Sequence, residues 1–124
     1  MIEHFRAHWF DRIAQGSTLA DRSAAELAVS PGRAEGRIAH WSLCRAVAAL
    51  QRGARRPLHI GAIGAPTTTP SERAFLSVLD AMANGDQALA QRHAEWLVHK
   101  SALPGLLGAV TPLADIYPKL ARAA

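Results

Sequence analysis

The chain has 124 residues, of which 49% are hydrophobic and 19% charged, and its formal net charge is +4. A chain of this size buries roughly two-thirds of the surface that its unfolded form exposes. It therefore needs no disulfide or metal to fold, and its composition argues against general disorder. Charged residues interrupt the N-terminal region and no apolar stretch is long enough to span a membrane, which argues against a signal peptide or a membrane segment. We expect a cytoplasmic protein whose residues 1–124 form one domain.

Three helices are predicted in the first half of the chain. Apolar residues spaced by three or four predict a helix over residues 2–15, namely Ile2, Phe5, Trp9 and Ile13. A second helix is expected over about 18–28. The pair Ser30-Pro31 joins an N-cap hydroxyl to a proline suited to the first helical position. It predicts the start of a third helix, which should run to about Arg52.

The third helix carries apolar residues on two different sides. Ala34, Ile38 and Trp41 share one side, whereas Leu43, Val47 and Leu50 lie more than a quarter-turn away. This pattern indicates a central helix with neighbours in two directions, and it predicts that Trp41 is buried. The tryptophans of the first, third and fifth helices are expected to form one aromatic core: Trp9, Trp41 and Trp96. Cys44 cannot form an internal disulfide, since it is the only cysteine, and a buried thiol is expected.

Residues 53–69 break the helical pattern with three glycines and two prolines. They predict a long irregular loop, with a short extended piece at about 58–63. Loops of this length inside a compact domain are uncommon unless they are functional or mobile.

Two further helices follow the loop. Thr69 and Glu72 form a capping box that predicts a helix over 70–83, and Asn84-Gly85-Asp86 predicts a tight turn into a helix over 86–100. Prolines and glycines punctuate the remaining tail, which is expected to hold one or two short helices. The predicted fold is an all-α bundle of about five helices with short C-terminal helical turns.

Residues 23–38, SAAELAVSPGRAEGRI, resemble the helix-turn-helix of bacterial DNA-binding domains. The resemblance implies a recognition helix from Pro31 onward, with Arg33 and Arg37 able to reach phosphates or guanine edges. Two glycines inside that helix, Gly32 and Gly36, depart from the pattern, because each costs about 1 kcal/mol relative to alanine. Two capped helices that meet at Ser30-Pro31 explain the same residues.

A second candidate site is basic. Arg52, Arg55, Arg56 and His59 lie at the end of the third helix and in the loop. Glycines follow them, so that backbone amides could approach an anion or an acidic partner closely. Arginines near a helix C-terminus also complement the helix dipole without binding anything.

The histidines offer one weak metal candidate. His4 and His8 share a face of the first helix, and Asp11 lies near one further turn along. A closed metal site needs three or four ligands, and the sequence supplies no obvious third at a fixed offset. His40 lies four residues before Cys44 on the third helix, within reach of the thiol. The fragments RAHWFDRIA (6–14) and RIAHWSLCRAVA (37–48) echo one another, but two copies do not establish a repeat.

No catalytic motif is present in the sequence. We expect a protein without enzymatic activity or cofactor. The leading hypothesis is a binding or adaptor protein that acts through helix surfaces and the loop 53–69, with a protein partner or self-association. The alternative hypotheses are a helix-turn-helix-like nucleic-acid binder using residues 23–41, and a helical protein that binds a small ligand or a metal.

Overall fold

The computed structural model describes residues 1–14 and 33–123, and within them it contains α-helices and one short 3-10 helix but no strand. The elements are α1 (Ile2–Ala14), α3 (Arg33–Gly53), α4 (Pro70–Ala83), α5 (Gln87–Leu97), η1 (Lys100–Ala102) and α6 (Leu103–Ala123). The predicted all-α bundle is confirmed, and α1 begins at its predicted first residue, Ile2. The predicted helix over 18–28 lies outside the described residues.

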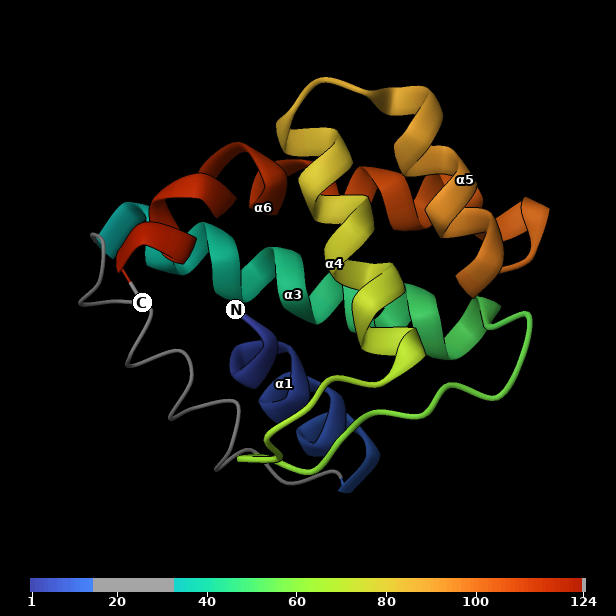
Figure 1. The fold of residues 1–124 in the computed structure, drawn as a ribbon, viewed down its shortest axis with the longest axis horizontal. Helices are drawn as coiled ribbons and strands as arrows, with labels where there is room; N and C mark the ends of the chain where they lie inside the picture. Colours follow the sequence, from blue (N-terminus) through green and yellow to red (C-terminus); the bar gives the residue numbers. More distant parts are fainter. Residues whose placement is uncertain (15–32, 124) are drawn as a thin grey trace.

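Helix α3 lies at the centre of the bundle (Figure 1), with α6 running along it and α1 on another side. Its core face is nearly inaccessible to solvent and consists of Ala39, Leu43, Ala46, Val47 and Leu50. Helices α4 and α5 form an antiparallel hairpin that packs against α6.

The predicted burial of Trp41 is wrong. Its exposed fraction is 52%, and that of Ile38, one turn earlier, is 41%. Only the second of the two apolar sides of α3 meets the core, so the side that carries Trp41 faces outward. The guanidinium of Arg45 lies 4.6 Å from the centre of the Trp41 ring, a cation–π contact that suits a partly exposed indole.

The aromatic core therefore differs from the predicted one. Phe5 of α1 stacks on Phe75 of α4 with ring centres 4.3 Å apart, and Trp9 lies 6.2 Å from Phe5. Trp96 is only half-buried, and its ring lies under the Arg56 guanidinium at 4.2 Å. Phenylalanines thus join α1 to α4, while two of the three tryptophans lie at the surface beside arginines.

The C-terminal tail is also not as predicted, because α6 is a helix of 21 residues. Pro104 lies in its first turn, where a missing N–H costs nothing. Pro112 lies inside the helix, where it removes the amide that would donate to the Gly108 carbonyl. The Ser42 hydroxyl donates to the carbonyl of the next residue, Ala109, at 2.5 Å. Tertiary packing outweighs the helix-breaking residues, since one face of α6 is buried in the core: Leu103, Leu106, Ala109, Val110, Leu113 and Ala114.

The predicted capping box at the start of α4 and the predicted turn after its end are both confirmed. The Thr69 hydroxyl accepts a hydrogen bond from the Glu72 amide at 3.1 Å, and the Glu72 carboxylate accepts one from the Thr69 amide at 2.9 Å. Gly85 adopts a positive φ of 77° between the helices, and the Asp86 carboxylate accepts from the Leu89 amide to cap α5.

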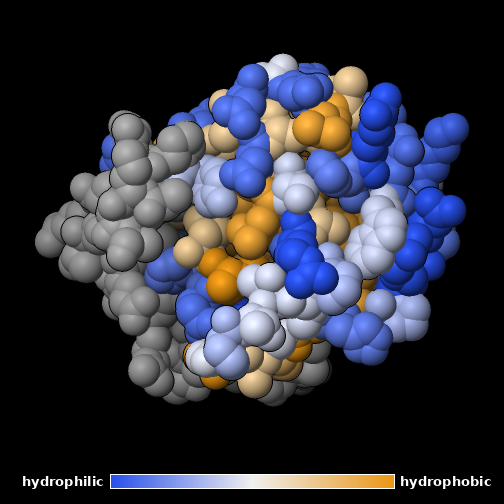
Figure 2. All heavy atoms as spheres, in the orientation of Figure 1, coloured by the Kyte–Doolittle hydropathy of each residue, from blue (hydrophilic) through white to orange (hydrophobic). Residues whose placement is uncertain are grey.

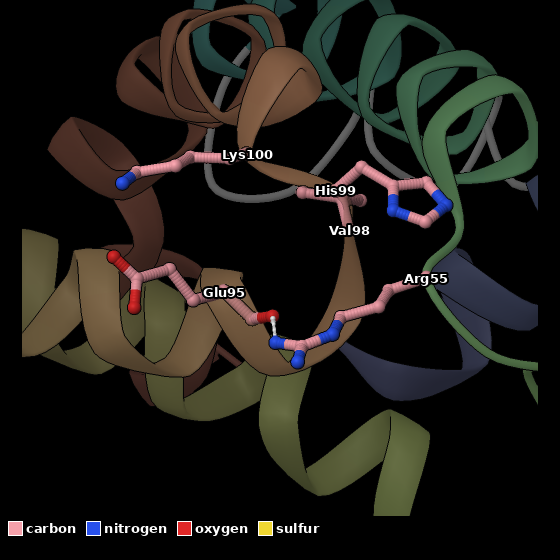
Figure 3. A pocket seen from close by; sticks show the side chains of 5 residues that line it. All are labelled: Arg55, Glu95, Val98, His99 and Lys100. Atoms are coloured by element: carbon pink, nitrogen blue, oxygen red, sulfur yellow. Dashed lines mark hydrogen bonds between the residues drawn. The ribbon is translucent and has the colours of Figure 1, made fainter.

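Helix α5 ends at Leu97, earlier than the predicted residue 100. Val98 is extended and forms an isolated antiparallel β-bridge with Ala54. The Arg55 amide donates to the Leu97 carbonyl at 3.0 Å, and the His99 amide donates to the Gly53 carbonyl at 2.9 Å. The bridge fixes the chain after α3 against the chain after α5, which brings Arg55 close to Val98 and His99 (Figure 3).

The loop predicted at 53–69 is irregular from residue 54 onward and contains no strand at 58–63. A fully buried ion pair holds it against α1. The Arg6 guanidinium donates to both oxygens of the Glu72 carboxylate, at 2.6 and 2.9 Å, and to the carbonyls of Ala65 and Thr67. A further bond to Glu3, at 2.7 Å, brings all five N–H donors of Arg6 into use.

Glu72 is equally well satisfied, because its carboxylate also accepts from the Gly61 amide at 3.0 Å. Burial alone would raise the pKa of the Glu72 carboxyl, but hydrogen bonds from Arg6, Thr69 and Gly61 outweigh it and lower that pKa below its ordinary value. The pair fixes the position of α1 and of the loop.

No described helix is both long enough and apolar enough to cross a membrane. On the face drawn in Figure 2, hydrophilic side chains gather at the end of the molecule where α5 and the C-terminal end of α3 lie. Apolar atoms show there as smaller patches among polar ones.

Candidate metal centre between α1 and α3

The site begins with His8, a histidine of α1 that is 3% exposed. Its Nδ1 lies 2.7 Å from the carbonyl oxygen of His4, one turn earlier on the same helix. A carbonyl only accepts hydrogen bonds, so Nδ1 carries a proton. In the neutral ring with this tautomer, Nε2 bears the lone pair.

That lone pair points at a histidine of α3. His8 Nε2 lies 2.8 Å from His40 Nδ1, and the ring centres are 4.9 Å apart. In that tautomer His8 Nε2 accepts the hydrogen bond and His40 Nδ1 donates it, so that a neutral His40 ring keeps its lone pair on Nε2.

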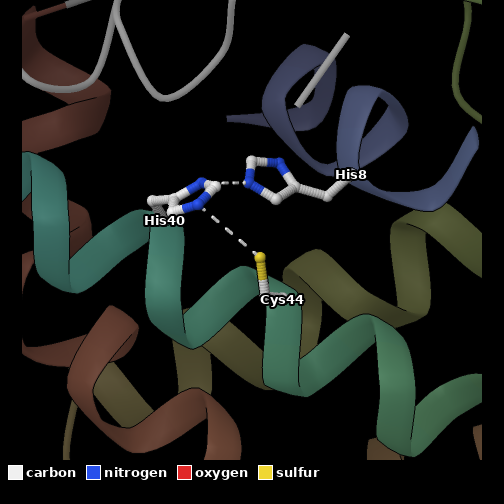
Figure 4. Close-up of side chains that lie close together, drawn as sticks. All are labelled: His8, His40 and Cys44. Atoms are coloured by element: carbon white, nitrogen blue, oxygen red, sulfur yellow. Dashed lines mark hydrogen bonds between the residues drawn. The ribbon is translucent and has the colours of Figure 1, made fainter. Parts of the chain in front are cut away.

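Cys44, one turn along α3, completes the group. Its Sγ lies 3.9 Å from His40 Nε2, and Figure 4 shows the two contacts that link the three side chains. The thiol is exposed, so the predicted burial of Cys44 is wrong. In the described part of the chain, one ligand atom from each of His8, His40 and Cys44 lies within 4.8 Å of the others. We call these three residues the His–Cys cluster.

Helix geometry and packing together build this cluster. Residues four apart lie on one helix face, which places Cys44 beside His40. His8 reaches them because α1 packs against α3, where the alanines that precede the two histidines, Ala7 and Ala39, are both buried. The ion pair between Arg6 and Glu72 fixes α1 only two residues before His8.

The donor set suits a transition-metal ion. Zn²⁺ binds imidazole nitrogen at about 2.0–2.1 Å and thiolate sulfur at about 2.3 Å, so ligand atoms of a tetrahedral site lie roughly 3.3–3.8 Å apart. Separations of up to 4.8 Å in the cluster would shorten by about 1 Å to reach these distances, and the 2.8 Å contact between His8 Nε2 and His40 Nδ1 would lengthen by about 0.5 Å if that nitrogen is the ligand. His40 is half-buried and Cys44 exposed, so their side chains have room to rotate.

Of the two weak metal candidates, His8 belongs to the His–Cys cluster. His4 contacts it through its backbone carbonyl, which accepts a hydrogen bond from the His8 ring, as carbonyls do beside metal-binding histidines. The Asp11 side chain lies outside the described residues. The spacing of His40 and Cys44 is visible in the sequence, whereas the contact of His8 with His40, 32 residues away, depends on the tertiary structure.

The predicted nucleic-acid site is described only in part. Residues 23–32, which carry most of the resemblance to a helix-turn-helix, and the side chain of Arg33 lie outside the described residues. Arg37 is exposed on α3. The nucleic-acid hypothesis therefore stays a prediction.

The structure separates the four members of the predicted anion site. Arg55 and Arg52 line two neighbouring cavities, while Arg56 covers Trp96. His59 lies in the loop, where its amide donates to the Ser71 hydroxyl and its carbonyl accepts from the Thr69 hydroxyl.

Comparison with known proteins gives no relative. No protein-family model, no curated protein and no solved structure matches the chain.

Proposed function

We propose that this protein binds a transition-metal ion of the zinc type at the His–Cys cluster. The observation that carries the proposal is the convergence of two imidazoles and one thiol from two helices within 4.8 Å. His8 Nε2, one ring nitrogen of His40 and the Cys44 thiolate would be the ligands. Imidazole and thiolate favour zinc, copper and other late transition metals over Mg²⁺ and Ca²⁺, which prefer oxygen ligands.

The fixed orientation of His8 supports this function further. The His4 carbonyl accepts from Nδ1–H, so that in the neutral ring the Nε2 lone pair faces His40. Metal-binding histidines typically have such a second hydrogen bond, which sets the tautomer and the ring orientation. Three protein ligands leave one position of a tetrahedral ion open to water or to another donor.

Competition with a chromophoric chelator tests the proposal, using the reduced, metal-free protein and Zn²⁺. The expected result is one zinc ion per chain, with affinity at least about tenfold weaker in Cys44→Ser and His40→Ala, since each removes one ligand. His59→Ala removes an exposed histidine of the loop and should bind zinc as the wild type does. Equal zinc affinity in the wild type and in both ligand variants would contradict the proposal.

A second function, protein binding, is favoured by the exposed face of α3. Ile38 and Trp41 are partly exposed there, Arg37 is exposed on the same helix, and the Arg45 guanidinium lies over the Trp41 ring. We propose that this face binds a protein segment that is both apolar and acidic, because tryptophan and arginine are enriched where proteins bind one another. Two copies of this face would oppose arginine to arginine, which disfavours self-association through it.

Selection from a random peptide library tests this second function. Peptides retained by the wild type but not by Trp41→Ser should combine acidic and apolar residues. Trp96→Phe, which alters a tryptophan on α5, should retain the same peptides. Recovery of the same peptides with Trp41→Ser would contradict the assignment of this face.

A further inference from the structure

We propose a second ligand site, for a small organic phosphate, in a cavity at the far end of α3. The cavity has a volume of about 410 Å³ and is lined by Arg55, Glu95, Val98, His99 and Lys100. We call it the Arg55 cavity. The proposal is independent of metal binding, because none of these residues belongs to the His–Cys cluster.

Basic side chains come to this cavity from two distant segments of the chain. Arg55 follows α3, whereas His99 and Lys100 follow α5, and the β-bridge between Ala54 and Val98 joins the two segments. Backbone hydrogen bonds on both sides of the bridge, at 2.9 and 3.0 Å, fix their relative position. The groups that would hold an anion are thus anchored to a rigid backbone, which lowers the entropic cost of binding.

The Arg55 side chain is itself oriented. One terminal nitrogen of its guanidinium donates to the backbone carbonyl of Glu95 at 3.1 Å, and Figure 3 shows the side chain lying across the cavity. That bond uses one of five N–H donors, and the others remain for a ligand. A guanidinium presents paired donors that match the oxygens of a phosphate.

Basic side chains outnumber acidic ones in this region, where Arg52, Arg55 and Lys100 face the single acid Glu95. Arg52 lines an adjoining cavity of about 250 Å³, which also shares His99. Within the described residues, Arg52, Arg55 and Lys100 make no ion pair at 4 Å or less. The carboxylate of Glu95, the one acid of the Arg55 cavity, accepts a hydrogen bond from the Gln91 side chain. Arg52 can complement the dipole of α3, but Arg55 and Lys100 lie beyond that helix.

The shape of the site favours a small ligand over a nucleic acid. A volume of about 410 Å³ lies in the range of small-molecule pockets, typically about 300–1,000 Å³. The buried Val98 supplies an apolar wall for the organic part of a ligand. A phosphate monoester combines a compact double negative charge with such a part.

Titration of ¹⁵N-labelled protein with phenyl phosphate, followed by NMR, tests the proposal. Phenol is the neutral probe and inorganic phosphate the probe without an apolar part. Saturable shifts are expected at the amides of Arg55, His99 and Lys100 with phenyl phosphate, weaker ones with inorganic phosphate and none with phenol. Each of Arg55→Ala and Lys100→Ala should weaken the affinity by about tenfold, the loss typical of one charge-assisted contact.

Two matched variants sharpen the result. Arg92→Ala removes an exposed arginine of α5 that does not line the cavity, and it should leave the affinity unchanged. Glu95→Gln removes the one acid and should strengthen binding. Unsaturable shifts spread over all exposed arginines would overturn the proposal, as would an affinity that Arg55→Ala leaves unchanged. Binding of duplex DNA through Arg55 and Lys100, with no binding of phenyl phosphate, would also overturn the proposal. That result would show that the surface binds nucleic acid.

Discussion

Two polar clusters attach α1 to the rest of the bundle, and they differ in how deeply they are buried. The pair of Arg6 and Glu72 is completely buried, and every donor of the arginine has an oxygen partner within the protein. The His–Cys cluster begins two residues later on α1 and ends in an exposed thiol. A closed, fully buried network of this kind fixes the fold, whereas a cluster that reaches the surface is accessible to an ion from solvent.

The largest effect is expected from opening the closed network. Arg6→Leu would leave the Glu72 carboxylate buried without its cation, and loss of one partner of a buried pair costs about 3–5 kcal/mol. Urea denaturation should show this loss of unfolding free energy. Arg92→Leu, at an exposed position, should change the same quantity by less than about 0.5 kcal/mol. A loss in Arg6→Leu no greater than in that control would show that the pair does not hold α1 in place.

Acid should weaken the same network without mutation. The pKa of Glu72 is lowered in the folded state, so its contribution to stability is present above the unfolded-state pKa of about 4.3 and is lost as the pH falls through the folded-state value. The urea midpoint of the wild type should therefore fall as the pH is lowered from about 5 to 3. Glu72→Gln, which starts from a lower midpoint, should fall less over this range. Parallel curves for the two proteins would contradict this account of the carboxylate.

A smaller effect is expected at the edge of the network, where Thr69 caps α4. Thr69→Ala removes the acceptor of the Glu72 amide and the donor to the His59 carbonyl. Loss of such a cap typically costs about 1 kcal/mol. Thr69→Ser keeps the hydroxyl and should recover most of the stability in the same urea experiment. A serine variant as unstable as the alanine variant would show that the hydroxyl bonds are not the cause.

The features of the fold that could be predicted are those fixed by neighbours in the sequence. The capping box at Thr69 and Glu72, the turn at Gly85 and the boundary of α1 each depend on residues a few positions apart. Helix α6 could not be predicted in this way, because its prolines and glycines predict interruptions of the helix when only neighbouring residues are considered. Its apolar face against α3 outweighs them, and only the packed structure shows that face.

The candidate sites also depend on tertiary packing that neighbouring residues in the sequence do not reveal. Trp41 and Cys44 follow the apolar pattern of α3, but which side of that helix meets the core depends on where α6 lies. Two local signals pointed to the His–Cys cluster: the four-residue spacing of His40 and Cys44, and the repeated Ala-His-Trp tripeptide at 7–9 and 39–41, whose two histidines are those that meet. It is not a structural repeat, because Trp9 is buried and Trp41 exposed.

The smallest effect on stability is expected at the open end of the cluster. Cys44→Ser changes an exposed side chain by one atom and should alter the unfolding free energy by less than about 0.5 kcal/mol. Its effect on metal binding should be large, because the thiolate is the ligand that selects a soft metal. A large loss of stability in the metal-free variant would show that Cys44 serves the fold and not an ion.

The absorption spectrum of the Co²⁺-loaded protein tests the metal centre most directly, because a thiolate bound to cobalt gives a near-ultraviolet charge-transfer band. Since Cys44 is the only cysteine, that band can arise only from this position. The account predicts a thiolate band that saturates at one equivalent of Co²⁺, is absent in Cys44→Ser and is displaced by Zn²⁺. His40→Ala should weaken the binding while His59→Ala should not. No thiolate band with the reduced wild type at saturating Co²⁺ would contradict a metal site at His8, His40 and Cys44.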